Sequence, residues 1–442
     1  MLRCLNAALV AVCLACGLAA AGGPARAAPA ILVDAATGEV LYAHRAFDRW
    51  HPASITKLMT AYLAFSAIRA GQLAPDSPVQ ISKNALDNPP SKMGFPVGTR
   101  ITLSSALKML IVKSANDIAV AVGETVGGSE PAFVELMNRT AGRLGMNATH
   151  FVNPHGLHDP NQYTSARDMA VLARAILHEF PQYEFLFSVP SIKVGKRVLR
   201  THNRLVGRYP GATGMKTGYI CSGGYNLVAS AKRGGREYIA VVLGAPNGSY
   251  RALVAAHLLE NGFDGMRGFT SGRYGSIESY RGRGAEPFDM RPYLCKPRSQ
   301  RPPIPGSIAS YGFEVPIAQG DAEVEDSEEV DPMSRRGVAA IQVSSRRASS
   351  RAERIAALLA GPATGAPVNA NGLLPADPLA SMTLPRSIPF PPRTVTVATG
   401  GNTPAAAQAA AAPAVAASSL ANNDAAALLR PSIPLPPRRP ER

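Results

Sequence analysis

Strand patterns at residues 30–42 and 224–243, with helical patterns between them, constrain the fold of this chain most. Ala30-Ile31-Leu32-Val33 and Glu39-Val40-Leu41-Tyr42 flank a turn that ends in glycine, which predicts a hairpin. Residues 224–232 and 237–243 flank a Gly234-Gly235 turn and predict a second hairpin. Apolar residues at helical spacing predict helices between and after them, at 52–69, 103–125, 131–144, 166–179 and about 249–262. A sheet covered by helices, an α+β arrangement, is the simplest fold that satisfies this order.

The first 27 residues are typical of a secretory signal peptide. Arg3 supplies a positive start, Leu5 to Ala21 form an apolar stretch, and Ala25-Arg26-Ala27 is a small-x-small cleavage site. No later apolar run reaches the roughly 20 residues that span a bilayer. We therefore expect export to the periplasm, the compartment of the cell wall, with cleavage near Ala27.

A change in composition predicts the end of the folded part near residue 265. Residues 320–331 carry seven acidic side chains, residues 335–354 carry six arginines, and residues 405–417 are low in complexity. Such blocks are usually solvated and disordered. The predicted organisation is a signal peptide at 1–27, a domain at 28–265, and a largely disordered tail at 266–442. On this basis a chain shortened to 28 to about 270 is expected to fold and keep its activity.

The formal net charge is +15, a balance for which nucleic acid is the usual partner. An exported protein meets anionic wall polymers and membrane surfaces instead, so we expect the basic tail to contact those and no nucleic acid. Of the five cysteines, only Cys221 and Cys295 lie outside the first 27 residues. The sequence favours two separate thiols, and a bridge between them remains open.

Three short segments carry side chains for chemistry: Ser54-Ile55-Thr56-Lys57, Ser114-Ala115-Asn116 and Lys216-Thr217-Gly218. Each alone is a weak signal, because an ordinary buried helix, a helix cap and a polar edge strand contain the same residues. Together they provide a hydroxyl nucleophile, an amine to deprotonate it, a second hydroxyl with an amide, and a cation. Acyl transfer on an amide that ends in a carboxylate requires this set.

Local patterns place each segment. Ser54 and Lys57 are three residues apart, so they share one face of a helix, and Pro52 suits its first turn. The Ser114 segment interrupts an apolar helical run, where its polar groups need partners. The Lys216 segment precedes the second hairpin, so we expect it on an exposed sheet edge, where Gly218 lets a substrate backbone approach.

On these segments, with residues 145–151, 155–157 and 224–230, the chain resembles the low-molecular-mass penicillin-binding proteins, the serine-type D-alanyl-D-alanine carboxypeptidase family. The resemblance covers about residues 30–262. It implies a penicillin-binding/serine β-lactamase-like domain with an antiparallel sheet covered by helices. It also implies no cofactor and no metal, peptidoglycan stem peptides as substrates, and β-lactam antibiotics as covalent inhibitors.

The resemblance also implies a role for each site residue. Ser54 would attack the carbonyl between two terminal D-alanines, Lys57 would take its proton, and Ser114 would relay that proton to the leaving amine. Asn116 would hold the peptide, and the backbone N–H groups of Ser54 and Tyr219 would form the oxyanion hole. The residues expected to receive the substrate carboxylate are Lys216, Thr217, Arg204 and Arg251.

Other functions remain open from the residues. A D,D-endopeptidase that cuts cross-links has nearly the same motifs. A β-lactamase needs an acid to activate water, and Glu135 is the one conceivable stand-in. A penicillin sensor would acylate without turnover. A zinc peptidase is suggested by the cluster His150, His155, His158 and Asp159, but His178-Glu179 lacks a second helical histidine.

Overall fold

The structure is a computed structural model that describes residues 28–265, 274–304 and 311–312. The predicted signal peptide and most of the predicted tail lie outside the described residues. Among the residues that are described, no helix is long and apolar enough to cross a membrane.

A five-stranded antiparallel sheet organises the described part of the chain, in the order β2-β1-β9-β8-β7. Its strands are β1 (Ala30–Asp34), β2 (Val40–His44), β7 (Ala212–Ile220), β8 (Gly224–Arg233) and β9 (Arg236–Ala245). The two predicted hairpins are therefore confirmed, and β1 pairs with β9, so the ends of the stretch meet in one sheet. The strand that carries Lys216-Thr217-Gly218 is the edge strand β7, as predicted.

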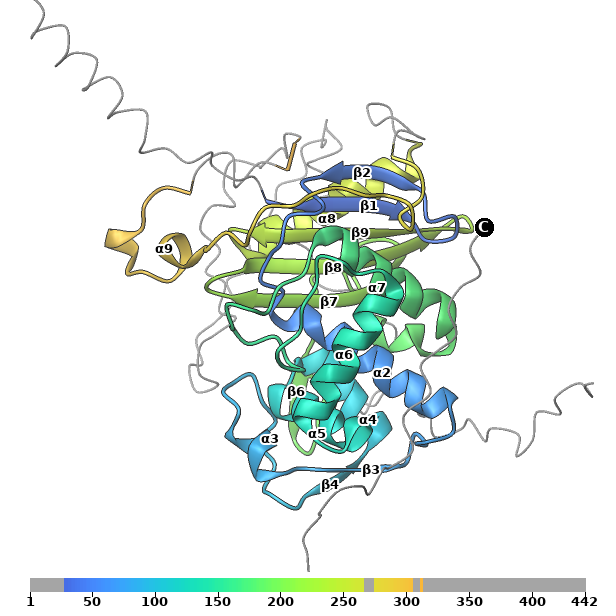
Figure 1. Ribbon diagram of the computed structural model, residues 1–442, viewed down its shortest axis with the longest axis vertical. Coiled ribbons are helices and arrows are strands. Elements are labelled where there is room, and N and C mark those ends of the chain that lie inside the picture. Colours follow the sequence, from blue (N-terminus) through green and yellow to red (C-terminus); the bar gives the residue numbers. More distant parts are fainter. Residues whose placement is uncertain (1–27, 266–273, 305–310, 313–442) are drawn as a thin grey trace, which may run out of the picture. The chain divides into compact units, whose positions relative to one another are not determined.

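Helices cover both faces of the sheet (Figure 1), with α8 (Gly248–Phe263) and α7 (Ala166–Glu179) on opposite sides. On the α8 side, Leu32, Leu227 and Val242 from the sheet pack with Leu258 and Leu259 of the helix. Such a layered core stabilises the fold mainly by removing apolar area from water.

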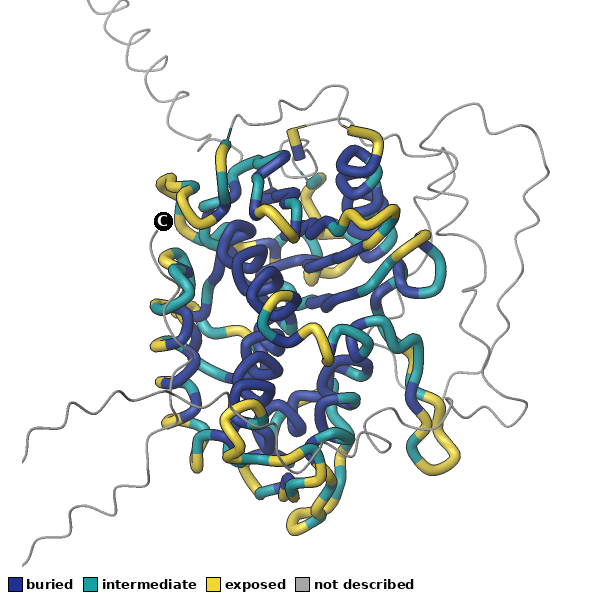
Figure 2. Tube along the Cα trace, turned by 90° about the vertical axis from the view of Figure 1, so that its right-hand side faces the viewer, coloured by how far each residue is buried: buried dark blue, intermediate teal, exposed yellow. Residues whose placement is uncertain are grey.

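The remaining helices form a second group beside the sheet. They are η1 (Ala53–Thr56), α2 (Lys57–Arg69), α3 (Lys83–Asp87), α4 (Leu103–Lys108), η2 (Met109–Lys113), α5 (Asn116–Gly127), α6 (Glu130–Leu144) and η3 (Pro181–Ser188). Two short ribbons complete it, β3 (Pro78–Gln80) with β4 (Arg100–Thr102), and β5 (Ser191–Val194) with β6 (Arg197–Arg200). α2 is buried along nearly its whole length, and Figure 2 shows buried backbone running through the central helices and the sheet. The predicted helix over 103–125 is broken at Ser114-Ala115.

Residues 274–304, called the strap below, lie against this domain although the sequence predicted a disordered tail from 266. Ile277 N donates to Gly38 O at 2.8 Å, Arg49 N to Ala285 O at 2.9 Å, and Met290 N to Ser222 O at 3.0 Å. The strap ends with the short helices α9 (Arg291–Leu294) and η4 (Arg298–Gln300). Contacts with the domain therefore extend beyond the predicted boundary at 265, and folding and activity of a chain of residues 28 to about 270 stay a prediction. The composition did not indicate these contacts, because backbone hydrogen bonds and scattered aromatic contacts hold the strap. Such contacts leave no periodic apolar pattern in the sequence.

Cys221 and Cys295 form a disulfide, so the expectation of two separate thiols is also wrong. Cys221 lies in the turn between β7 and β8, and Cys295 directly follows α9. The strap brings the two residues together across a sequence separation of 74, which no local pattern reveals.

Candidate active site

Ser54 lies in η1, a single turn that precedes the buried helix α2. Two glycines make room for this turn. A Cβ at Gly218 would lie 2.9 Å from both Pro52 O and Ser54 N, and one at Gly156 would lie 1.9 Å from Ala53 O. Glycine is therefore required where β7 and the 153–157 turn press against η1 from two directions. Ser54 is half-buried, and its Oγ lies next to Lys57 Nζ.

Lys57 begins α2 and is 0% exposed. Its Nζ lies 2.8 Å from each of three oxygen atoms, Ser54 Oγ, Asn116 Oδ1 and the backbone oxygen of His155. Burial lowers the pKa of Lys57 well below its usual value, and the charge of Lys216 lowers the pKa further, against a smaller opposing effect of Asp117.

The Ser114 segment supplies the partners of both lysines. Ser114 has a φ of 63°, a left-handed conformation that ends η2 and lets α5 start at Asn116. Asn116 directs its Oδ1 to Lys57, while its Nδ2 donates to Pro89 O at 3.0 Å. Ser114 Oγ lies 2.9 Å from Lys216 Nζ. The break in the helix, which the sequence had predicted to run unbroken over 103–125, thus brings a hydroxyl and an amide to two different amines.

On β7, successive side chains alternate between the two faces of the sheet. Lys216 and Gly218 face η1 and the Ser114 segment, as the contact of Lys216 with Ser114 and the close approach of Gly218 to η1 indicate. Thr217 and Tyr219 belong to the other face, where the Tyr219 ring lies 4.2 Å from the Tyr225 ring between centroids. As the edge strand, β7 has one side without a neighbouring strand of this sheet.

The two arginines expected to receive a carboxylate differ in exposure. Arg204 is half-buried, and its Nη1 donates to Ser249 Oγ at 2.5 Å. Arg251 is 1% exposed, and its guanidinium donates to the backbone oxygens of Asn226 at 3.4 Å and His202 at 3.3 Å. Arg251 is therefore buried, and its guanidinium is bound to the backbone of β8 and of the 202–204 loop.

Asn226 holds the segment that leads into Ser54, and the sequence analysis includes it only as part of residues 224–230. It is 0% exposed, and its Nδ2 donates to the backbone oxygens of His51 at 2.9 Å and Pro52 at 3.0 Å. Asn226 thereby ties β8 to the segment that leads into Ser54. An asparagine inside an apolar strand pattern was the available signal, since a buried amide must find hydrogen-bond partners.

The histidines of the suggested zinc cluster have separate roles. His155 is buried, which lowers its pKa to about 3, and its backbone oxygen contacts Lys57. His158 Nδ1 lies 3.0 Å from Ser222 Oγ, and His150 Nδ1 lies 2.8 Å from Asn161 O. Within the described ranges, no group of three or more His, Cys, Asp or Glu residues is arranged to hold a metal ion.

The site thus combines a serine hydroxyl, a buried amine with a lowered pKa, a second hydroxyl next to a second amine, and a free strand edge. Comparisons with known proteins agree with this chemistry. The family model described as D-alanyl-D-alanine carboxypeptidase matches residues 19–247. D-alanyl-D-alanine carboxypeptidase DacD of Salmonella typhimurium is 38% identical over 239 residues, which make up 52% of this chain and 61% of that protein. The chain therefore spans about three fifths of the length of this relative.

Two solved structures are similar as well. Penicillin binding protein 6B from Escherichia coli is 37% identical with a TM-score of 0.52, over 55% of this chain and 79% of that chain. Penicillin-Binding Protein D2 from Listeria monocytogenes, in its cefotaxime bound form, is 28% identical with a TM-score of 0.50, over 55% of this chain and 99% of that chain. The penicillin-binding/serine β-lactamase-like fold predicted from the sequence is therefore confirmed.

Proposed function

The chain belongs to the D-alanyl-D-alanine carboxypeptidase family, and we propose from this premise that it is an exported serine D,D-carboxypeptidase. It removes the terminal D-alanine from peptidoglycan stem peptides through an acyl-enzyme on Ser54. It uses no cofactor and no metal.

The surroundings of Lys57 carry this proposal. A neutral lysine amine has two N–H bonds and one lone pair. Asn116 Oδ1 and His155 O, each 2.8 Å from Lys57 Nζ, can only accept hydrogen bonds. They therefore accept the two N–H bonds of the amine. The lone pair then remains for the proton of the Ser54 hydroxyl, which lies at the same distance. Burial and the charge of Lys216 favour the neutral form by lowering the Lys57 pKa. Lys57 is therefore arranged as the base that activates the nucleophile.

The proposed reaction uses these contacts. Ser54 Oγ forms a bond to the carbonyl carbon between the two D-alanines while its proton moves to Lys57. The tetrahedral intermediate collapses as the C–N bond breaks, and the leaving amine takes a proton through Ser114. Water then attacks the ester carbonyl and gives a proton to Lys57. The bond between the carbonyl carbon and Ser54 Oγ breaks as Lys57 returns that proton to Ser54, which releases the shortened peptide. The first proton moves between groups in hydrogen-bond contact, Ser54 Oγ and Lys57 Nζ at 2.8 Å, and Ser114 Oγ is held by Lys216 Nζ at 2.9 Å.

The backbone N–H groups of Ser54 and Tyr219 form the oxyanion hole in this proposal. Support comes from the close approach of β7 to η1, since a Cβ at Gly218 would lie 2.9 Å from Ser54 N. Two N–H groups fixed by a strand and by a helix start need no rearrangement when negative charge develops on the carbonyl oxygen.

Recognition of the free carboxylate is assigned to Lys216, Thr217 and Arg204, with Arg251 as a positioning residue. Arg251 donates to His202 O in the loop that carries Arg204. A carboxypeptidase must distinguish a chain end from an internal peptide, and the terminal charge is the chemical difference. Charge-assisted contacts to that carboxylate supply the distinction.

The cefotaxime-bound relative supports the extension that β-lactams acylate Ser54 here as well. Export through the segment 1–27 and contact of the basic tail with anionic wall or membrane surfaces belong to the same proposal, on sequence grounds. The family match favours the carboxypeptidase over the D,D-endopeptidase and the β-lactamase.

The test is release of D-alanine from a soluble tripeptide that ends in two D-alanines, compared between the unmodified chain and Ser54→Ala. We expect release by the unmodified protein and a loss on the order of 10⁴-fold or more in the variant. Equal release by both would refute the assignment. Faster cleavage of a cross-linked dimer than of the monomer would favour the endopeptidase instead.

A further inference from the structure

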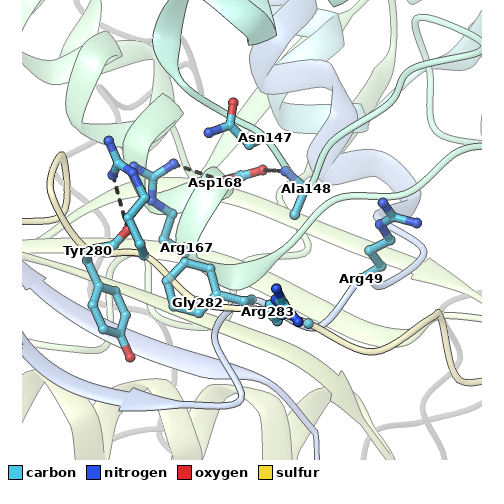
Figure 3. Close-up of a pocket in the computed structure, with 11 residues that line it drawn as sticks. Arg49, Asn147, Ala148, Arg167, Asp168, Tyr280, Gly282 and Arg283 are labelled. Atoms are coloured by element: carbon cyan, nitrogen blue, oxygen red, sulfur yellow. Dashed lines mark hydrogen bonds and ion pairs between the residues drawn. The ribbon is translucent and has the colours of Figure 1, made fainter.

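A cavity lies away from the three catalytic segments, between the strap and the start of α7 (Figure 3). It has a volume of about 330 Å³. One wall is strap residues 280–284, and the opposite wall includes Arg49, Asn147 and Arg167. The family model ends at residue 247, so the strap wall lies outside the region that the family shares.

Positive charge dominates the lining of this cavity. Four arginines line it, Arg49, Arg167, Arg281 and Arg283, against a single acidic residue, Asp168. The carboxylate of Asp168 is already engaged, because it accepts hydrogen bonds from Ala148 N, Thr149 Oγ1 and Arg167 Nη1. The guanidinium of Arg167 is also engaged, by Ile277 O, Gly145 O and Asp168, so Arg49 and the two strap arginines supply the excess of cationic donors.

The arginines of the strap are the ones available to a ligand. Arg281 and Arg283 are exposed, and Arg281 donates only to backbone oxygens, those of Glu278 and Tyr280. Neither pairs with a carboxylate among the described residues. Arg49 pairs with Glu286 at 2.8 Å, and at 37% and 71% side-chain exposure this ion pair contributes little to stability and can exchange partners.

The sequence Arg281-Gly282-Arg283-Gly284 explains how both arginines reach the cavity. A Cβ at Gly282 would lie 2.3 Å from the Phe47 ring, and a Cβ at Gly284 would lie 1.8 Å from Phe47 O. Only glycine lets the strap lie directly on Phe47 at both positions. Arg281 and Arg283, the residues next to these glycines, then line one cavity together with the Tyr280 ring. That ring packs on Phe47 at 4.7 Å between centroids.

We propose that this cavity is a binding site for a small anion with more than one negative charge, either a group of neighbouring carboxylates or a phosphate. Guanidinium groups bind carboxylate and phosphate oxygens through paired N–H donors, and several of them around one cavity match a multivalent anion. The volume exceeds that of a single ion, so there is room for the group that carries the charge, against the Phe47 and Tyr280 rings. Both carboxylate-rich and phosphate-containing polymers satisfy this chemistry.

The experiment measures binding of citrate and of inorganic pyrophosphate to the full chain by calorimetry, at constant ionic strength. The test variant is Arg281→Gln with Arg283→Gln. The matched control is Arg298→Gln with Arg301→Gln, which removes the same charge from exposed positions of the same strap outside the cavity. A third variant, Arg281→Lys with Arg283→Lys, keeps the positive charge and removes the paired N–H donors of the guanidinium groups.

We expect one or both probes to bind the unmodified protein, about ten- to hundredfold weaker binding to the glutamine test variant, and unchanged binding to the control. Lysine at both positions should restore only part of the affinity. A preference for citrate identifies a carboxylate source, and a preference for pyrophosphate identifies a phosphate source. Equal weakening by test and control variants would show that diffuse charge binds the anion, and no binding of either probe would also overturn the proposal. D-alanine release from a soluble tripeptide should be the same in all variants, so failure here leaves the proposed function untouched.

Discussion

Removal of the Cys221–Cys295 disulfide, by Cys221→Ser with Cys295→Ser, is expected to destabilise the domain strongly while leaving the active site formed. The bridge closes a loop with a sequence separation of 74, for which loss of chain entropy in the unfolded state gives about 4 kcal/mol. The native strap keeps its other anchors, including the Met290 N to Ser222 O hydrogen bond and the Phe288 ring stacked on Trp50. The free energy of unfolding should therefore fall by about 2–4 kcal/mol without loss of the folded state.

Urea denaturation followed by fluorescence measures this change, and acylation by a fluorescent penicillin in dilute buffer measures the site. The acylation rate should stay within a few-fold, because β7 keeps its register with β8 from Ala212 to Ile220. Reductant should lower the stability of the unmodified protein to that of the double variant and leave the variant unchanged. A fall in the free energy of unfolding of less than about 1 kcal/mol would refute the entropy argument. Loss of acylation in the fully folded variant would show that the disulfide itself holds Tyr219 in place.

Three further predictions concern the catalytic residues. Lys57→Arg should lose nearly as much acylation by penicillin as Lys57→Ala, because a guanidinium stays protonated; retention of most of the rate would make the lysine an electrostatic aid. Acylation needs neutral Lys57, so its rate rises with pH through the lowered pKa, and Lys216→Ala should move that rise to higher pH because it removes a charge that lowers the pKa. The exposed Lys232→Ala serves as control for the pH profile, and an unmoved profile in Lys216→Ala would contradict the coupling. Arg204→Gln should weaken cleavage of a free-acid peptide by about tenfold while sparing the C-terminal amide; equal losses would remove Arg204 from carboxylate recognition.

Local sequence signals predicted the sheet and the helices around the site. The two hairpins and the edge position of β7 were predicted because each depends on residues close together in the chain. The helix predicted over 103–125 is instead broken before Asn116. The three segments also predicted which side chains meet, since Lys57 contacts both Ser54 and Asn116.

What the sequence could not predict depends on contacts between distant residues. The strap carries no apolar periodicity, and its anchors pair residues 34–50 and 221–222 with residues 275–295. Arg251 was expected at the carboxylate, yet its burial beneath the strands follows from how α8 packs and not from its own neighbours. The sequence shows that the buried Asn226 amide needs hydrogen-bond partners. It does not show that these partners are backbone oxygens just before Ser54.

The central claim is that Ser54 becomes acylated with Lys57 as the base. Mass spectrometry of the peptides obtained after brief exposure to penicillin tests it most directly. We expect one added penicilloyl group on the peptide that contains Ser54, and no such group in Ser54→Ala. In Lys57→Ala the same adduct should form on the same residue at a strongly reduced rate. An adduct on Ser114 or on any other residue of the unmodified protein would contradict the account.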